Sequence, residues 1–237
     1  MAWDYEQSEK RIKQHLAGMP EIEVEKLEKE ADLENLLSES NCREIYAAHA
    51  YVDIANFSRL TANGDTASDL KKLLRAIHIY QRQLAWIIES HLDGVRVHFQ
   101  GARVHAVFYR PIDKGEALAE KAFLFMLIVR DFVRYVFNPA FPAYENLAVS
   151  GGADIGTVIG TQNGLKGDRE LLFLGRPANY AAKIIATGLR LTTAMHEALP
   201  EALQDACELV DEDAGIYRAT GIGKDDLLDL TEAGGIT

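Results

Sequence analysis

The order of elements along the chain predicts an α+β domain with a ferredoxin-like plan, in which a mostly antiparallel sheet carries helices on one face. Two observations lead to this prediction. Two long segments repeat apolar residues at three- and four-residue steps, which is typical of amphipathic helices. Between and after them lie short segments rich in β-branched and aromatic residues, which indicate strands. The predicted order is strand, helix, hairpin, helix, strand, helix, strand.

The elements can be placed one after another along the chain. Residues 45–54 predict the first strand, residues 69–92 an amphipathic helix, and residues 114–137 a second, strongly apolar helix. Between the helices, short strands over 95–100 and 103–108 flank a glycine and predict a hairpin. The later elements are strands over 146–154, 157–160 and 171–174, helices over 178–187 and 194–205, and a last strand over 215–219.

Residues 1–40 differ from the rest and predict an N-terminal helical extension, so we expect the main domain over residues 41–237. One helix is expected over residues 4–16 and a second, rich in acidic residues, over residues 21–37. The extension is either a solvated helical segment or an arm that contacts a second copy of the chain. A thin apolar seam for such a contact would consist of Leu27, Ala31, Leu36 and Leu37.

Composition and charge exclude several classes of protein. The chain is 48% hydrophobic with only six prolines, which excludes collagen-like and wholly disordered proteins. Its net charge of −11 disfavours binding to a nucleic acid polymer, although a small nucleotide needs only a local pocket. We expect a cytoplasmic protein without a membrane span: it has only two cysteines, residues 1–19 do not form a signal peptide, and the longest apolar run, residues 122–129, is short.

Asp53 is the first candidate for chemistry. It stands at the end of a hydrophobic strand, where a carboxylate is costly to bury unless it is paired or binds a metal ion. The loop over residues 54–58 follows directly, and its backbone N–H groups could bind phosphates. The alternative is that Asp53 only caps this loop.

Four segments, taken together in their order and spacing, resemble the catalytic domain of class III nucleotidyl cyclases, the adenylate and guanylate cyclase family. That family's first strand ends in Asp-Ile-x-x-Phe-Ser/Thr, which residues 53–58 match. Its Leu-Gly-x-x-x-Asn-x-Ala-x-Arg motif is matched by residues 174–183 except at the last position. The hairpin strand over 96–103 and the glycine-rich strand over 152–160 complete the resemblance, which covers residues 45–228.

The resemblance implies that a nucleoside triphosphate is converted to its 3′,5′-cyclic monophosphate and pyrophosphate with Mn²⁺ or Mg²⁺. The implied metal ligands are Asp53 and the backbone carbonyl of Ile54, and Asp154 is a candidate additional ligand whose alternative is a hydrogen-bonded turn residue. Asn179 and Lys183 would orient the ribose and stabilise charge on the α-phosphate. The other candidate substrate-binding residues are Tyr51, Ala55, Asn56, Phe57, Ser58, His98, Arg103 and Leu172.

The departures from the family's pattern concern the metal site and the base pocket. Ala102 stands where the family has its second metal carboxylate, and Lys183 replaces the usual arginine. His98 and Leu172 stand at the two positions that read purines in the family. We therefore expect a pyrimidine, UTP or CTP with UTP slightly favoured. The narrower resemblance is to the pyrimidine cyclases of bacterial Pycsar anti-phage systems, which implies a cyclic UMP or cyclic CMP messenger for a separate effector.

The resemblance also implies a homodimer with composite sites. Asp53 and the phosphate loop would come from one chain, and Asn179, Lys183 and the base pocket from the other. The alternative is a catalytically degenerate domain that binds a nucleotide or a partner, which Ala102 favours and the retained Asp53 disfavours. Arg103 is either a phosphate-binding cation or a surface charge. The histidines without metal-ligand spacing, His49, His78, His105 and His196, are expected to be structural or surface residues.

Overall fold

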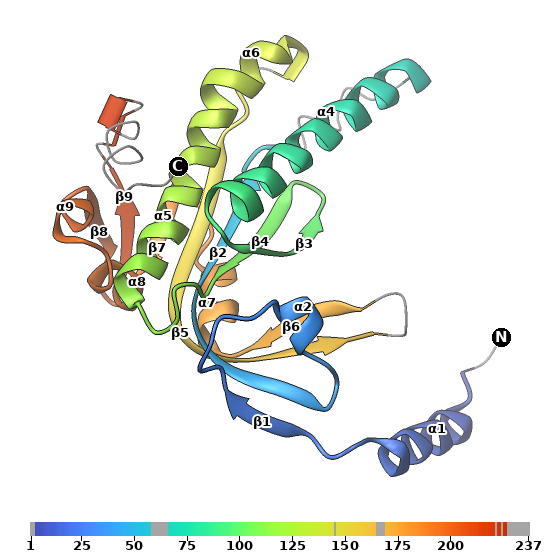
Figure 1. Ribbon diagram of the computed structural model, residues 1–237. Coiled ribbons are helices and arrows are strands. Elements are labelled where there is room, and N and C mark those ends of the chain that lie inside the picture. The colour runs from blue at the N-terminus through green and yellow to red at the C-terminus, as the bar shows by residue number, and fades with distance from the viewer. Residues whose placement is uncertain are drawn as a thin grey trace.

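A single mixed sheet forms the centre of the molecule in the computed structural model, which describes residues 3–57, 66–144, 146–164, 169–220, 222–223 and 225–226. These residues form nine strands (Figure 1). The main path, in spatial order, is β3 (Val95–Gln100), β4 (Arg103–Phe108), β2 (Asn41–Ile54), β5 (Val149–Asn163), β7 (Leu189–Thr192), β9 (Ile216–Ala219) and β8 (Cys207–Asp211). Off this path, β1 (Glu23–Lys26) pairs with β2 and β6 (Glu170–Leu174) pairs with β5.

The two longest strands, β2 and β5, pair antiparallel along almost their whole length, from Arg43 opposite Gly160 to Ile54 opposite Val149. The sheet is mostly antiparallel, and among the described strands only the β1–β2 and β5–β7 pairs are parallel. The predicted α+β class and the predicted hairpin of β3 and β4 are confirmed. The two strands expected over 146–160 are instead the single strand β5, because the backbone continues through the glycines without losing its partner β2.

Two long helices cover one face of the sheet (Figure 1). Helix α4 (Ala67–Trp86) continues into a π-helical turn (Ile87–His91), and α5 (Gly115–Phe132) continues likewise (Val133–Phe137). Both helices were expected from their apolar periodicity. The side chain of Thr66 caps α4 by accepting a hydrogen bond from the Asp69 N–H at 3.2 Å. The main core between these helices and the sheet includes Leu84, Ile88, Phe123 and Phe125.

Helix α7 (Arg176–Lys183) packs on the opposite face of the sheet, which differs from the predicted plan. Neighbouring residues of a strand point to opposite faces. A Cβ atom on Gly151 would lie 3.0 Å from Met126 Sδ of α5, whereas one on Gly152 would lie 2.2 Å from the Ala181 carbonyl oxygen of α7. The two adjacent glycines therefore let one helix approach each face.

The N-terminal segment contains less helix than predicted. Helix α1 (Tyr5–Gly18) is present and buries no residue, but residues 21–37 are not a continuous helix. They form β1, which pairs in parallel with the start of β2, and the short helix α2 (Leu33–Leu36). The alternation of acidic and apolar residues at 21–25 suits a strand, and pairing with β2 satisfies its backbone. Leu27 and Leu37, expected in a seam for a second copy, are buried in their own chain.

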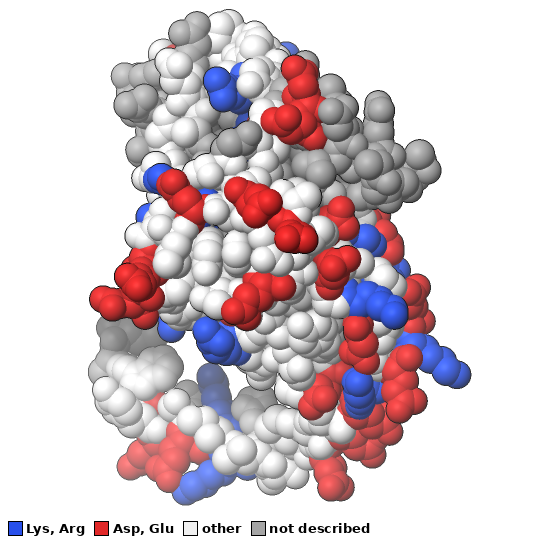
Figure 2. Space-filling view, turned by 90° about the vertical axis from the view of Figure 1, so that its left-hand side faces the viewer, with Lys and Arg blue, Asp and Glu red and all other residues white. Residues whose placement is uncertain are grey.

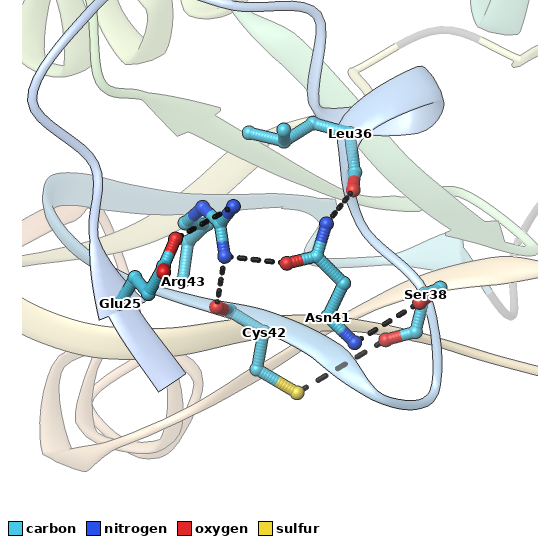
Figure 3. Close-up of polar contacts among 6 residues, drawn as sticks. All are labelled: Glu25, Leu36, Ser38, Asn41, Cys42 and Arg43. Atoms are coloured by element: carbon cyan, nitrogen blue, oxygen red, sulfur yellow. Dashed lines mark hydrogen bonds and ion pairs between the residues drawn. The ribbon is translucent and has the colours of Figure 1, made fainter. Parts of the chain in front are cut away.

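Arg43 ties β1 to the start of β2 (Figure 3). One guanidinium nitrogen lies 3.1 Å from a carboxylate oxygen of Glu25 on β1. The other donates to the Asn41 side chain and to the Cys42 carbonyl oxygen. Asn41 in turn donates to the Leu36 carbonyl oxygen at 2.8 Å. These contacts join β1, α2 and β2 into one corner of the domain.

The C-terminal part also departs from the sequence prediction. The helix expected over 194–205 is two short helices, α8 (Thr193–Glu197) and α9 (Glu201–Gln204), separated at Pro200. Strands β7 and β8 were not predicted, whereas β9 was. The remaining short elements are α6 (Asn138–Ala140) and a 3₁₀ turn (Pro142–Tyr144). Within the described residues, no helix has the length and apolar character needed to cross a membrane.

Candidate active site

Two separate hollows lie at the sheet and bring together most of the predicted site residues. The larger, about 510 Å³, is lined by Tyr51, His98, His105, Leu172, Phe173 and Asn179 among others, and is called the aromatic hollow here. The smaller, about 400 Å³, is lined by Asp53, Ile54, Ala55, Phe57, Ala102 and Arg103 among others, and is called the carboxylate hollow. Among the residues that the structure describes, none lines both hollows.

Stacked rings form one wall of the aromatic hollow. The rings of Tyr51 on β2 and His105 on β4 are stacked, with centroids 4.1 Å apart and planes 9° apart. These residues are direct neighbours in the β2–β4 register, and His98 on β3 meets His105 edge-on at 5.8 Å. Burial raises the pKa of Tyr51, and nearby Arg103 opposes that shift. Leu172 adds apolar surface, so the predicted residues Tyr51, His98 and Leu172 do meet at one hollow.

A pair of buried histidines lies behind this wall. His49 Nδ1 is 3.0 Å from His105 Nε2, and the two side chains are 0% and 3% exposed. Burial lowers the pKa of His49 to about 3 and that of His105 well below its usual value. His105 also lines the aromatic hollow, a position that the sequence did not predict. The signal in the sequence is that His49 and Tyr51 stand two residues apart on β2. Their side chains therefore lie on the same face of the sheet, and His105 stands opposite Tyr51.

Asp53 carries an ion pair in the carboxylate hollow. One terminal guanidinium nitrogen and Nε of Arg103 lie 2.9 Å and 3.1 Å from Asp53 Oδ2. The side chain of Arg103 is 38% exposed and that of Asp53 is 23% exposed. Ala102, next to Arg103, is buried in the main core and offers no ligand. The guanidinium of Arg103 thus forms an ion pair with Asp53. Arg103 directly follows Ala102, the position at which the family pattern has its second carboxylate.

The loop after Asp53 is held to the chain before β5. The Ala55 N–H donates to the Ala148 carbonyl oxygen at 2.8 Å, so this N–H is not free for a phosphate. The Asn56 side chain accepts from the Ala148 N–H at 3.1 Å and donates to the Asn146 carbonyl oxygen at 2.9 Å. Ala55 and Asn56 therefore fix the loop. Phe57 lines the carboxylate hollow.

The other predicted residue of this loop, Ser58, lies outside the described residues.

Asp154 is not brought to Asp53. It stands opposite His49 in the β2–β5 register, whereas Asp53 stands opposite Ser150, so the two carboxylates are about 13 Å apart along the strands. Asp154 is 1% exposed and accepts a hydrogen bond from Thr192 Oγ1 at 2.5 Å. Burial raises its pKa, and the Thr192 hydrogen bond opposes this shift. The structure therefore corrects the suggestion that Asp154 replaces the missing ligand: it is a buried, hydrogen-bonded strand residue.

Among the described residues that line the carboxylate hollow Asp53 is the one carboxylate, and this donor set fits a single divalent cation. Both contacts of Arg103 go to Oδ2, which leaves Asp53 Oδ1 without a hydrogen-bond partner among the described residues. Mg²⁺ is commonly held by one or two carboxylates together with substrate phosphates. In the part of the chain that the structure describes, no group of three or more His, Cys, Asp and Glu side chains forms a metal site.

Asn179 and Lys183 lie one helical turn apart on α7. Asn179 lines the aromatic hollow, and its side chain donates to the Gly175 carbonyl oxygen at 3.1 Å. Lys183 is exposed and does not line that hollow. The close approach of α7 to Gly152 sets the position of both side chains relative to the sheet.

The curated relatives of this chain that we report share one name. The chain is 28% identical over 217 residues to a uridylate cyclase of Pseudomonas aeruginosa, covering 87% of this chain and 42% of the relative. It is 29% identical over 145 residues to a uridylate cyclase of Rhodovulum sp. (strain MB263), covering 60% of this chain and 58% of the relative. The chain therefore spans about half the length of these relatives. No family model matches it.

Solved structures give the fold comparison. A class III adenylyl cyclase-like ATP-binding protein from Pseudomonas aeruginosa matches with a TM-score of 0.76 at 24% identity, over 99% of this chain and 49% of that one. The adenylyl cyclase CyaB from P. aeruginosa matches with a TM-score of 0.65 at 15% identity, over 78% of this chain and 98% of that one. The guanylyl cyclase Cya2 matches with a TM-score of 0.62 at 15% identity, over 76% of this chain and 94% of that one.

Proposed function

Because this chain has the class III nucleotidyl cyclase fold, we propose that it is a pyrimidine nucleotide cyclase, which converts UTP or CTP to the 3′,5′-cyclic monophosphate and pyrophosphate. The observation that carries the proposal is the wall of the aromatic hollow. Tyr51, stacked on His105, and Leu172 give this hollow aromatic and apolar walls instead of the polar pair that reads a purine. The uridylate cyclase names of the curated relatives support the choice of a pyrimidine.

The reaction is an intramolecular phosphoryl transfer. The ribose 3′-oxygen forms a bond to the α-phosphorus, the bond to the β-phosphate oxygen breaks, and the 3′-hydroxyl proton is released. Such chemistry depends on positioning and on neutralising charge. Asn179 would orient the ribose, and Lys183 and Arg103 would supply positive charge to the phosphates. Asp53, with the Ile54 carbonyl, would hold one Mn²⁺ or Mg²⁺, which when bound lowers the pKa of the 3′-hydroxyl and neutralises phosphate charge.

A homodimer with composite sites is part of the proposal. The two hollows have separate linings, which supports a site in which the carboxylate hollow of one chain faces the aromatic hollow and α7 of another. Two-fold symmetry would then give two equivalent sites.

The cyclic nucleotide would act as a messenger for a separate effector in the cytoplasm of a bacterium that defends itself against phage. The neighbourhood of the encoding gene tests this part: a gene for a cyclic-nucleotide-binding effector beside it is the expected finding.

The experiment incubates the chain with ATP, GTP, CTP and UTP in turn, with Mn²⁺ present, and identifies products by mass spectrometry. Cyclic UMP or cyclic CMP is expected in clear preference to purine products, and Asp53→Ala should abolish it. Asp113→Ala is the matched control, because Asp113 is also in an ion pair, with Lys26, but lines neither of the two hollows. Turnover of ATP or GTP at rates that match the pyrimidines would contradict the proposal.

A second candidate function is nucleotide binding without turnover. Two observations on the described residues favour this alternative. Asp53 is the single carboxylate available to a cation at the carboxylate hollow, and it already forms an ion pair with Arg103. A solved neighbour described as an ATP-binding protein also favours it. Tight nucleotide binding by a folded dimer that turns over none of the four triphosphates would establish it.

A further inference from the structure

The proposed reaction leaves the two buried imidazoles behind the aromatic hollow without a role. His49 and His105 contact each other through His49 Nδ1 and His105 Nε2 at 3.0 Å. The other nitrogen of His49, Nε2, is buried and has no hydrogen-bond partner in the described structure. His105 differs, because it lines the hollow. One imidazole is therefore closed off and the other reaches the place where a base would lie.

The closed imidazole decides which nitrogen of the open one carries a proton. Both rings are held neutral by burial, since the pKa of each is lowered, with the nearby His98 acting in the same direction on His105. If His105 Nε2 donated, His49 would have to carry its own proton on Nε2, where an N–H would be buried without a partner. If His49 Nδ1 donates, only a bare nitrogen lone pair is left unpaired. Among buried backbone groups an N–H without a partner is rarer than an unpaired acceptor, and we apply the same order to the imidazole nitrogens.

It follows that His49 Nδ1–H donates to His105 Nε2, and that His105 carries its proton on Nδ1. Nδ1 is the ring nitrogen of His105 that His49 does not occupy. The ring cannot easily turn, because Tyr51 is stacked on it at 4.1 Å and His98 and Phe173 meet it edge-on at 5.8 Å and 6.3 Å. His105, which lines the aromatic hollow, thus carries a hydrogen-bond donor on a ring whose orientation is held by its neighbours.

We propose that His105 reads the pyrimidine base: its Nδ1–H donates to the O4 carbonyl of uracil, with His49 as the positioning residue that fixes the tautomer. Cytosine carries an amino group at the same place, so a donor would face a donor and neither group would be paired. The inference rests on the proposed function and makes it narrower, because it selects UTP over CTP.

Substitution of His105 by an aromatic residue that has no donor tests the base readout. His105→Phe should lower kcat/KM for UTP about 10- to 100-fold and leave that for CTP nearly unchanged, so that the preference is lost. His196→Phe is the matched control, because His196 is also stacked on a tyrosine, Tyr217, at 3.8 Å but lines none of the hollows described above. An unchanged UTP preference in His105→Phe, or an equal loss for both nucleotides, would overturn the proposal while leaving the cyclase function in place.

The role of His49 is tested by two variants. His49→Leu removes the donor to His105 and should weaken the UTP preference, whereas His49→Asn keeps an N–H near the Nδ1 position and should restore much of it. Loss of the preference in both variants to the same degree would mean that His49 acts only through packing.

A measurement on the unmodified chain does not depend on turnover or on the folding of variants. Long-range ¹H–¹⁵N spectra of chain labelled at histidine should show both His49 and His105 in the Nδ1–H tautomer. An Nε2–H tautomer at His105 would overturn the inference even if the chain produces cyclic UMP. If the chain turns over no nucleotide but shows the Nδ1–H tautomer and binds UTP more tightly than CTP, the readout stands and the proposed catalysis fails.

Discussion

At the scale of single residues, the buried His49 couples the stability of the fold to acid. In the unfolded chain a histidine titrates near 6.5, whereas burial lowers the pKa of His49 to about 3 in the folded chain. Between these values the unfolded state takes up a proton that the folded state does not, so the free energy of unfolding falls as pH falls. The slope is at most about 1.4 kcal/mol per pH unit.

We therefore expect His49→Phe to flatten the pH dependence of stability between pH 6.5 and 4, as measured by urea unfolding at a series of pH values. His78→Phe, at an exposed histidine, should leave the dependence as it is. A wild-type slope retained in His49→Phe would show that this imidazole is not held neutral by burial.

In the proposed site a cation at Asp53 would compete with Arg103, whose guanidinium lies 2.9 Å from Asp53 Oδ2. Arg103→Gln should therefore bind Mn²⁺ more tightly and yet turn over more slowly, because a positive charge near the phosphates is lost. The measurements are Mn²⁺ titration followed by electron paramagnetic resonance and turnover at saturating Mn²⁺. Arg96→Gln, which breaks the Arg96–Glu89 pair and removes an arginine of similar exposure, is the control. Unchanged Mn²⁺ affinity in Arg103→Gln would contradict the competition.

At the scale of elements, Gly152 sets how closely α7 approaches the sheet. A Cβ at this position would lie 2.2 Å from the Ala181 carbonyl oxygen, which is backbone and cannot move without α7. Gly152→Ala should cost about 1–3 kcal/mol of stability and lower turnover by displacing Asn179. Gly18→Ala is the control, because a Cβ there meets nothing within 4 Å. Thermal unfolding and turnover measure both effects, and a Gly152→Ala variant of wild-type stability would show that α7 can shift freely.

The elements that could be predicted are those whose signal is local. The β3–β4 hairpin is fixed by a glycine between two short runs, and α4 and α5 by long apolar periodicity. Strand β1 was missed because it is held by parallel pairing with β2 and not by burial of its own side chains. The short strands β7 and β8 carry few residues and are defined by their partners.

The candidate site was predictable in its residue types but not in its contacts. Asp53, His98, Leu172 and Asn179 were found from the motifs, and the structure places each at a hollow. The Asp53–Arg103 pair depends on the register between strands 50 residues apart, which no local pattern contains. The same is true of the His49–His105 contact, and the sequence alone predicts only a structural or surface role for His105.

At the scale of the whole molecule, the face seen in Figure 2 carries acidic side chains interspersed with lysine and arginine. Among the described residues on this face no broad basic patch is visible, and the net charge of the chain is −11. This face therefore lacks the basic surface by which proteins bind a nucleic acid polymer. Absence of binding to a nucleic acid polymer stays a prediction.

A mixture of two inactive variants tests the composite site. Asp53→Ala damages the carboxylate hollow and Asn179→Ala the aromatic hollow, so a heterodimer would have one site with both defects and one with neither. Equal mixing after subunit exchange should restore about a quarter of the wild-type rate. No recovery, with heterodimers demonstrated by native mass spectrometry, would mean that each chain carries a whole site.

The separation of the two hollows within one chain has a consequence for the rate law. If each working site needs two chains, the rate per chain is constant while the dimer persists and falls in proportion to concentration once dilution separates the subunits. A plot of specific activity against total protein should bend at the dissociation constant of the dimer. A cell would then set the strength of the signal by the abundance of this chain, since doubling a sparse population would quadruple the output.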